Sequence, residues 1–157
     1  PDQIISEGWM SLEDWNYCSK KALELFEFGQ KKAAENGMIL VDTKYEMGKD
    51  EDGNILLIDE IHTPDSSRYW IADSYEERME KQLEPQNIDK EFLRLWFVDN
   101  CDPYNDKMLP EAPEDLVLEL SSRYIYLYET ITGALFPFPN SEKSIYNRIN
   151  DNLKEVL

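Results

Sequence analysis

The segment Met38–Trp70, MILVDTKYEMGKDEDGNILLIDEIHTPDSSRYW, decides the fold of this chain. Two apolar runs, residues 38–41 and 55–58, each lead directly into charged residues, and a turn-rich segment separates them. Glycine, aspartate and asparagine between apolar runs favour a β-hairpin, so we predict a strand over 38–46 and its partner over 54–61. Charges at the ends of buried strands are costly unless they bind something. The same segment is therefore the candidate functional site.

Helical periodicity flanks the predicted hairpin on both sides. A serine cap at Ser11, followed by acidic residues, starts a long amphipathic helix that is expected to stop at Gly37. Further helices are expected over residues 73–83, from an Asn-Ile-Asp cap at 87–89, over 113–133, and from a cap at Ser141 onward. The predicted fold class is therefore α+β, an antiparallel β-sheet core flanked by helices. We expect residues 1–140 to form one domain and residues 141–157 a terminal helix, which either packs on that domain or mediates self-association.

Length and charge limit the classes of function. A chain of 157 residues is long enough for one domain with a real core, and its net charge of −17 argues against nucleic-acid and anionic-membrane partners. No run of roughly 18 apolar residues is present, so no membrane span is expected. Cys18 and Cys101 lack metal-ligand spacing and are expected to be reduced thiols in a cytoplasmic protein. Because the chain begins at Pro1 without a methionine, we expect a fragment, and any targeting sequence would lie upstream.

A cluster of charged side chains is predicted on one face of the hairpin. Side chains alternate between the two faces of a strand, so Asp42, Lys44 and Glu46 share a face. A regular hairpin pairs position 42 with about position 59 and brings Asp59 to that face, whereas a slip of one residue would bring Glu60 instead. Three carboxylates around one lysine form either an ion-pair cluster or a Mg²⁺ site. In the second case substrate phosphates complete the coordination and the lysine neutralises a phosphoryl group or a substrate carboxylate.

The segment Thr63–Arg68, TPDSSR, has the composition of an anion-binding loop. Proline and aspartate favour a turn, the two serines offer hydroxyl and backbone N–H donors, and Arg68 offers a planar fork suited to phosphate or carboxylate. The alternative is an ordinary capped turn with a surface arginine. Its position directly after the second predicted strand favours the substrate loop. The only histidine, His62, is expected to be structural rather than catalytic.

Three segments of the chain resemble one family of enzymes. LVDTKYEMG (residues 40–48), LLIDEIHTPDSSRYW (residues 56–70) and NIDKEFLRLWF (residues 87–97) closely resemble the SAICAR synthetases of purine biosynthesis, and more the longer plant-like form than the short bacterial one. The resemblance runs from about residue 5 to residue 133. It implies a fold related to ATP-grasp enzymes and protein kinases, in which ATP lies between two lobes. This chain is expected to be the carboxy-terminal lobe alone.

The resemblance also implies a reaction and a set of site residues. The family is an ATP-dependent ligase that joins L-aspartate to carboxyaminoimidazole ribonucleotide (CAIR), giving SAICAR, ADP and phosphate. Its functional positions fall on seven residues of this sequence: Mg²⁺ and ATP binding on Glu46 and Asp59, catalysis on Lys44 with Asp42 in support, and ribonucleotide binding on Arg68, Asp65 and Ser67.

The amino-terminal lobe of the family, with its phosphate-covering loop, would precede Pro1 and is therefore an expected partner of this chain. We expect the chain to fold alone but to have little ligase activity. A competing hypothesis is a non-enzymatic acidic binding module that keeps the fold. The absent lobe, the negative charge and the terminal helix all speak for that alternative.

Overall fold

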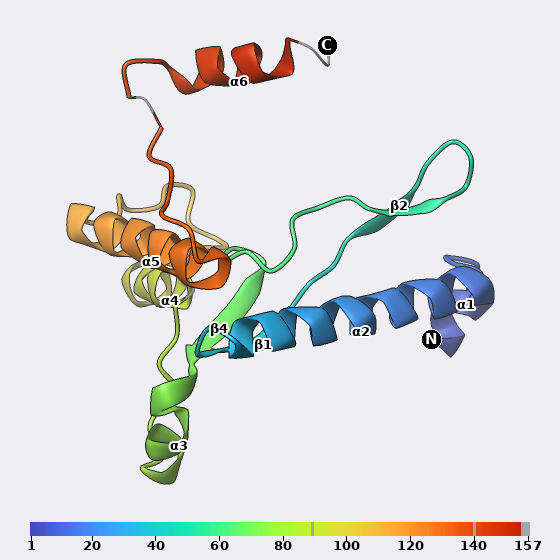
Figure 1. Ribbon diagram of the computed structural model, residues 1–157, viewed down its shortest axis with the longest axis horizontal. Helices are drawn as coiled ribbons and strands as arrows, with labels where there is room; N and C mark the ends of the chain where they lie inside the picture. Colours follow the sequence, from blue (N-terminus) through green and yellow to red (C-terminus); the bar gives the residue numbers. More distant parts are fainter. Residues whose placement is uncertain (89, 140, 155–157) are drawn as a thin grey trace.

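A long helix, α2 (Leu12–Ala34), packs against strand β1 (Met38–Thr43) in the computed structural model, which describes residues 1–88, 90–139 and 141–154 (Figure 1). The predicted cap is confirmed, because the Ser11 hydroxyl accepts a hydrogen bond from the backbone N–H of Asp14 at 3.1 Å. A short helix that was not predicted, α1 (Asp2–Ser6), precedes it. The helix ends slightly before the predicted Gly37, whose φ of +72° turns the chain into β1.

The strands form two separate antiparallel pairs. Strand β1 pairs with β4 (Ser67–Ile71), which places Asp42 opposite Arg68. Strand β2 (Met47–Lys49) pairs with β3 (Ile55–Leu57). The antiparallel character of the core agrees with the predicted fold class. The predicted hairpin, however, is wrong in extent and in register, because β1 takes β4 as its partner and Asp42 does not face Asp59.

Burial and turn geometry explain both differences. Leu40 on β1 and Tyr69 on β4 are each only 1% exposed, whereas β3 lies mostly in solvent, so β4 is the partner that completes a buried layer. The hairpin register is set by Asp50, whose carboxylate accepts the backbone N–H groups of Asp52 at 3.0 Å and Asn54 at 2.7 Å. This turn centres on Asp52, and the hairpin therefore pairs Met47 with Leu57.

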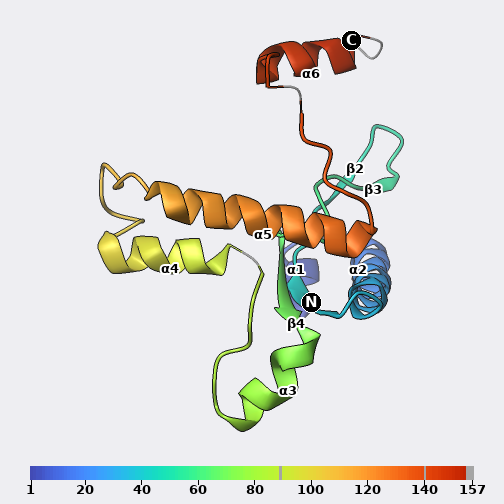
Figure 2. The ribbon, with the colours of Figure 1, turned by 60° about the vertical axis from the view of Figure 1, so that its left-hand side comes forward.

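The core joins the helices to the central strand pair. Its buried apolar residues come from α2, β1, β4, the segment before α4 and α5: Ala33, Met38, Leu40, Tyr69, Ile88 and Leu127. Strand β4 leads into α3 (Ala72–Glu80), and α4 (Glu91–Asn100) and α5 (Glu114–Thr132) lie side by side in both views (Figure 2). The candidate site lies where the start of α4 meets the end of β1 and the start of β4.

The predicted ends of the later helices are right in part. Helix α5 starts after Pro113 and ends at Gly133, whose φ of +68° allows the left-handed stop. Helix α3 begins at Ala72 without a side-chain cap and ends at Glu80, three residues before the predicted end at Leu83. The predicted cap of α4 includes Asp89, which lies outside the described residues.

The last helix, α6 (Ile145–Leu153), stands apart from the other elements in both views (Figures 1 and 2). Its cap is Ser144, whose hydroxyl accepts the N–H of Asn147, and not the predicted Ser141. The division into residues 1–140 and a terminal helix stays a prediction. Within the described parts of the chain, no helix has both the length and the apolar character that crossing a bilayer requires.

Candidate functional site

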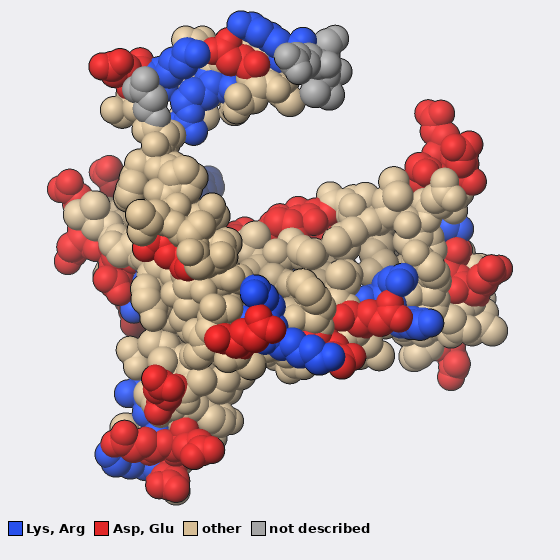
Figure 3. Space-filling model, viewed as in Figure 1, with Lys and Arg blue, Asp and Glu red and all other residues tan. Residues whose placement is uncertain are grey.

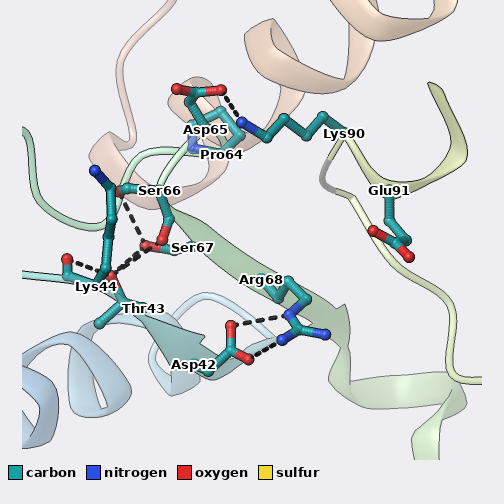
Figure 4. Close-up of a pocket in the computed structure, with 10 residues that line it drawn as sticks. All are labelled: Asp42, Thr43, Lys44, Pro64, Asp65, Ser66, Ser67, Arg68, Lys90 and Glu91. Atoms are coloured by element: carbon teal, nitrogen blue, oxygen red, sulfur yellow. Dashed lines mark hydrogen bonds and ion pairs between the residues drawn. The ribbon is translucent and has the colours of Figure 1, made fainter. Parts of the chain in front are cut away.

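A cavity of about 410 Å³ opens where the ends of β1 and β4 meet the start of α4 (Figure 4). It is lined by Asp42, Thr43, Lys44, Pro64, Asp65, Ser66, Ser67, Arg68, Lys90 and Glu91. Most of the predicted site residues therefore come together in one pocket. Glu46 and Asp59 do not line it, but they contact it through Lys44.

Arg68 is held in the pocket by its cross-strand partner. The β1–β4 register places Asp42 opposite Arg68, and Arg68 Nε donates to Asp42 Oδ1 at 3.0 Å. The terminal nitrogen Nη2 of Arg68 contacts the other carboxylate oxygen, Oδ2. A bidentate pair of this kind fixes the plane of the guanidinium group. The supporting role predicted for Asp42 thus has a direct geometric basis, although the predicted neighbour was Asp59.

Lys44 lies between the two carboxylates that were predicted to bind Mg²⁺ and ATP. Its Nζ donates to Glu46 Oε1 at 2.5 Å and to Asp59 Oδ2 at 3.2 Å. Glu46, followed by Asp59, raises the pKa of Lys44, so this side chain stays protonated near neutral pH. Hydrogen bonds from Glu60, and then from Lys44, lower the pKa of Asp59 to about 2. The cluster forms because the base of the hairpin continues through a hydrogen bond from Ile58 N to Glu46 O at 3.1 Å.

The two carboxylates suit a hard divalent cation, because they already converge on the ammonium group of Lys44. In the described ranges 1–88, 90–139 and 141–154, no three potential metal-binding side chains gather into a site. Glu46 and Asp59 would therefore supply two protein ligands, and oxygen atoms of a bound nucleotide or water would have to supply the others.

The segment after His62 is not simply a loop, because Ser67 and Arg68 already belong to β4. Ser67 is 4% exposed, and its hydroxyl lies 2.8 Å from that of Thr43 on β1. Its backbone N–H donates to the carbonyl of Thr63 at 2.9 Å, which closes the turn. The Ser67 hydroxyl therefore ties the two strands together at the pocket wall, and Ser66 is the less buried of the two serines.

Two further pocket residues come from the start of α4 and were missed in the sequence. Lys90 contacts the carboxylate of Asp65, and Glu91 turns into the pocket from the same helix end (Figure 4). Both belong to the segment 87–97, which in the sequence indicates only a capped helix and the family resemblance. The pattern in the sequence that could have indicated them is a lysine followed by a glutamate at the start of a helix. The pocket then holds three cations and three carboxylates.

The local balance of charge contrasts with the rest of the surface. Figure 3 shows acidic groups at several separate places, including the tip of the β2–β3 hairpin, where Glu51 and Asp52 are exposed. The chain has a net charge of −17, whereas the three cations of the pocket balance its three carboxylates, so an anion is repelled less at this cavity than by the chain as a whole.

His62 does not line the pocket and has a left-handed conformation, with φ of +58°. Its Nε2 is 2.7 Å from the hydroxyl of Tyr45, and its carbonyl accepts a hydrogen bond from the hydroxyl of Tyr69 at 2.7 Å. Burial lowers the pKa of His62 below its ordinary value. These contacts fit the structural role predicted for it.

The depressed pKa of His62 predicts a loss of stability in mild acid. The neutral ring is favoured in the folded state, so the unfolded chain binds more protons between the two pKa values. The contribution of the neutral His62 ring to the free energy of unfolding should be complete above about pH 6.5. It should be lost as the pH drops through the pKa of His62 in the folded chain, at a rate of at most about 1.4 kcal/mol per pH unit. Urea unfolding at pH 7.5 and in steps down to pH 5 measures this slope. His62→Gln should flatten it between pH 6.5 and 5.5, and an unchanged slope would contradict the prediction.

An α+β fold with a pocket of acidic and basic side chains at the ends of its central strand pair is the class of structure that the fold and the site define. The chain belongs to the SAICAR synthetase family, since the profile of that family matches residues 1–111. It is 58% identical over 157 residues to the chloroplastic phosphoribosylaminoimidazole-succinocarboxamide synthase of Arabidopsis thaliana, covering all of this chain and 38% of that protein. It is 55% identical to the synthase of Legionella pneumophila (strain Paris), covering all of this chain and 50% of the relative.

Solved structures give the same answer for the fold. A SAICAR synthase matches 78% of this chain with a TM-score of 0.60 and 34% identity, over 40% of its own chain. SAICAR synthase from Saccharomyces cerevisiae, complexed with SAICAR, matches 74% with a TM-score of 0.56 and 36% identity, over 38% of its chain. A type-2 SAICAR synthetase in complex with ADP matches 82% with a TM-score of 0.56 and 31% identity, over 42% of its chain. The predicted family and fold class are confirmed, and the chain spans half or less of these relatives.

Proposed function

We propose that this chain forms part of the active site of an ATP-dependent ligase that joins L-aspartate to CAIR, giving SAICAR, ADP and phosphate. The observation that carries the proposal is the pocket in which Lys44, Arg68 and Lys90 meet around one cavity. The names of the relatives support it, as do the ADP and the SAICAR held by two solved neighbours.

The ribonucleotide phosphate is assigned to the part of the pocket near Arg68. A guanidinium group held in plane by Asp42 offers two parallel donors to a phosphate, and Lys90 adds a second positive charge beside Asp65. Ser67 shapes the wall between them. Because Arg68 and Lys90 attract the phosphate by their charge, binding should weaken as the salt concentration rises.

Catalysis is assigned to Lys44, with Asp42 in support. A fixed positive charge next to the reacting groups stabilises the charge that develops on a transferring phosphoryl group. Lys44 suits this role because Glu46 and Asp59 keep it protonated and restrict its position. The same two carboxylates are assigned to the Mg²⁺ of ATP, which when bound supplies further neutralisation of phosphate charge.

The rest of the enzyme is assigned to the part of the relatives that this chain does not match, which is half or more of their length. We propose that the amino-terminal lobe of such an enzyme supplies the other wall of the ATP site and is the main partner of this chain. The predicted cytoplasmic location and homo-oligomer formation stay predictions, and the Arabidopsis relative is itself described as chloroplastic.

A chimera tests the proposed function directly. In the Legionella relative, the matched half is replaced by this 157-residue chain, and release of phosphate is measured with ATP, CAIR and aspartate. We expect ligase activity within about tenfold of the parent, dependent on all three substrates, and little activity from this chain alone. A folded chimera without activity would contradict the proposal. Retained binding of SAICAR by this chain would then favour the non-enzymatic binding module.

A further inference from the structure

Tyr45 and His62 join the two chain segments that carry the site. Tyr45 lies between Lys44 and Glu46, and His62 lies between the acidic pair that includes Asp59 and the turn that leads to Arg68. The Tyr45 hydroxyl is 2.7 Å from His62 Nε2, and the two rings meet edge to face with centroids 5.7 Å apart. One side-chain hydrogen bond therefore connects the two chain segments that supply the walls of the pocket.

His62 is itself fixed from two further directions. Tyr69, which is 1% exposed, donates its hydroxyl proton to the His62 carbonyl at 2.7 Å. A Cβ added at Gly29 would lie 2.5 Å from His62 Cε1, so the imidazole rests directly on the backbone of α2. The left-handed φ of +58° is one that few residues adopt without such support. The imidazole is therefore held in place by its contact with α2 and its hydrogen bond to Tyr45.

Past Thr43, whose hydroxyl lies 2.8 Å from that of Ser67, the contact between residues 44–46 and the turn at 63–66 is longer. Beyond the last β1–β4 pair, Lys44 N donates to Ser66 O at 3.4 Å, which is long for a backbone hydrogen bond. Tyr45 lies outside the strands, and its side chain is half-buried. Removing its hydroxyl should let residues 44–46 move against the turn at 63–66. The separation of the Lys44 and Arg68 cations would then no longer be fixed.

We propose that His62 is a positioning residue for the ligase reaction: through Tyr45 it holds the Lys44–Glu46 segment at a set distance from the substrate-binding turn and Arg68. The proposal rests on the proposed function, but it assigns a role to a residue that does not line the pocket. His62 touches no substrate in this arrangement, because its ring nitrogen Nε2 is engaged by Tyr45 and its carbonyl by Tyr69.

Tyr45→Phe in the chimera is the cleanest test, since it removes one oxygen atom and keeps the ring. We expect the KM for CAIR to rise about tenfold and kcat to fall less, because Arg68, assigned to the phosphate, and Lys44, assigned to the reacting end of CAIR, both remain but are no longer held at a set distance. The matched control is Tyr126→Phe on α5, a half-exposed tyrosine away from the pocket, which should change neither value. An unchanged KM together with a lower Tm would assign the bond a stability role only and overturn the proposal.

Two substitutions at His62 separate the side chain from the backbone. Glycine accepts the left-handed φ and removes the imidazole, whereas asparagine accepts the same φ and keeps a polar group. We expect His62→Gly to resemble Tyr45→Phe, and His62→Asn to recover part of the affinity. Equal KM values in the parent chimera and in His62→Gly would contradict a positioning role.

A second measurement keeps the inference distinct from the proposed function. This chain has one histidine, so its imidazole gives a single set of NMR signals that can be followed with the Arg68 Nε–H signal. Tyr45→Phe should shift the Arg68 signal as well as the His62 signals in the chain without ligand. If the parent chimera is inactive, the proposed function fails and the ligase role of His62 fails with it. An unmoved Arg68 signal in an otherwise active enzyme refutes the link between the two walls alone.

Discussion

Arg68→Ala in the chimera is expected to lower kcat/KM for CAIR by at least about 100-fold, mainly through KM. The substitution removes two parallel charge-assisted hydrogen bonds to the phosphate, each contributing roughly 1.5–3 kcal/mol, and tenfold in rate corresponds to about 1.4 kcal/mol. It also leaves the carboxylate of Asp42 without its guanidinium partner at the pocket wall. An uncompensated anion there repels the incoming phosphate. Steady-state kinetics with varied CAIR measures the effect.

Matched variants separate the charge of Arg68 from its geometry. Arg68→Lys keeps the charge but loses the fork, so it should recover only part of the lost affinity. Asp42→Asn keeps a hydrogen-bond acceptor and removes the repulsion, and the double variant with Arg68→Ala should be less defective than Arg68→Ala alone. Arg148→Ala on α6 controls for the loss of a cation elsewhere. A KM for CAIR that stays the same in Arg68→Ala would remove Arg68 from the substrate site.

Local patterns in the sequence predicted local structure well. The hydroxyl of Ser11 and the backbone freedom of Gly133 act within a few residues, and the structure has both helix ends where the sequence indicates them. Ser141 and Ser144 show the limit of such reasoning. Both precede the same amphipathic stretch, and only the fold of the backbone decides that Ser144 reaches the N–H of Asn147.

The pairing of strands that lie far apart in the sequence could not be predicted from local patterns. Residues 38–41 need a buried partner, and two runs were available, one nearby in sequence and one beyond the turn at 63–66. The sequence prediction pairs them with the nearer run, but Tyr69 gives β4 the buried aromatic side chain that β3 lacks. Ser67, a polar residue that is almost fully buried, hides the alternation of that strand. The choice of β4 over β3 as the partner of β1 therefore depends on how the strand pair packs against α2.

The candidate site shows the same division between local and distant information. Lys44, Glu46 and Asp59 do meet, yet they meet at the base of the short hairpin and not through the predicted register. Asp42 pairs with Arg68 instead, across strands that the prediction did not join. Lys90 reaches the pocket from a helix that follows later in the chain. The charged residues were therefore identifiable from the motif, whereas their pairing required the β1–β4 sheet.

Gly29→Ala is expected to destabilise the chain by about 1–2 kcal/mol, although the same change in an exposed helix normally stabilises it by up to about 1 kcal/mol. The new Cβ would lie 2.5 Å from His62 Cε1 and 2.7 Å from both His62 Nε2 and Leu40 Cδ2. Leu40 is 1% exposed and packed in the core, and the imidazole is held by Tyr45. Overpacking of this kind typically costs 1–3 kcal/mol, which exceeds the gain in helix propensity.

Urea unfolding of the chain gives the sign of this effect, with Gln30→Ala as the control at the next, exposed helical position. The control should leave stability within about 0.5 kcal/mol of the parent, because surface substitutions seldom do more. In Gly29→Ala the His62 NMR signals should also shift, since relief of the clash has to move the ring away from α2 and therefore away from Tyr45. A more stable Gly29→Ala chain with unmoved His62 signals would mean that the ring does not rest on α2. The support that holds the two walls of the pocket together would then have to come from elsewhere in the fold.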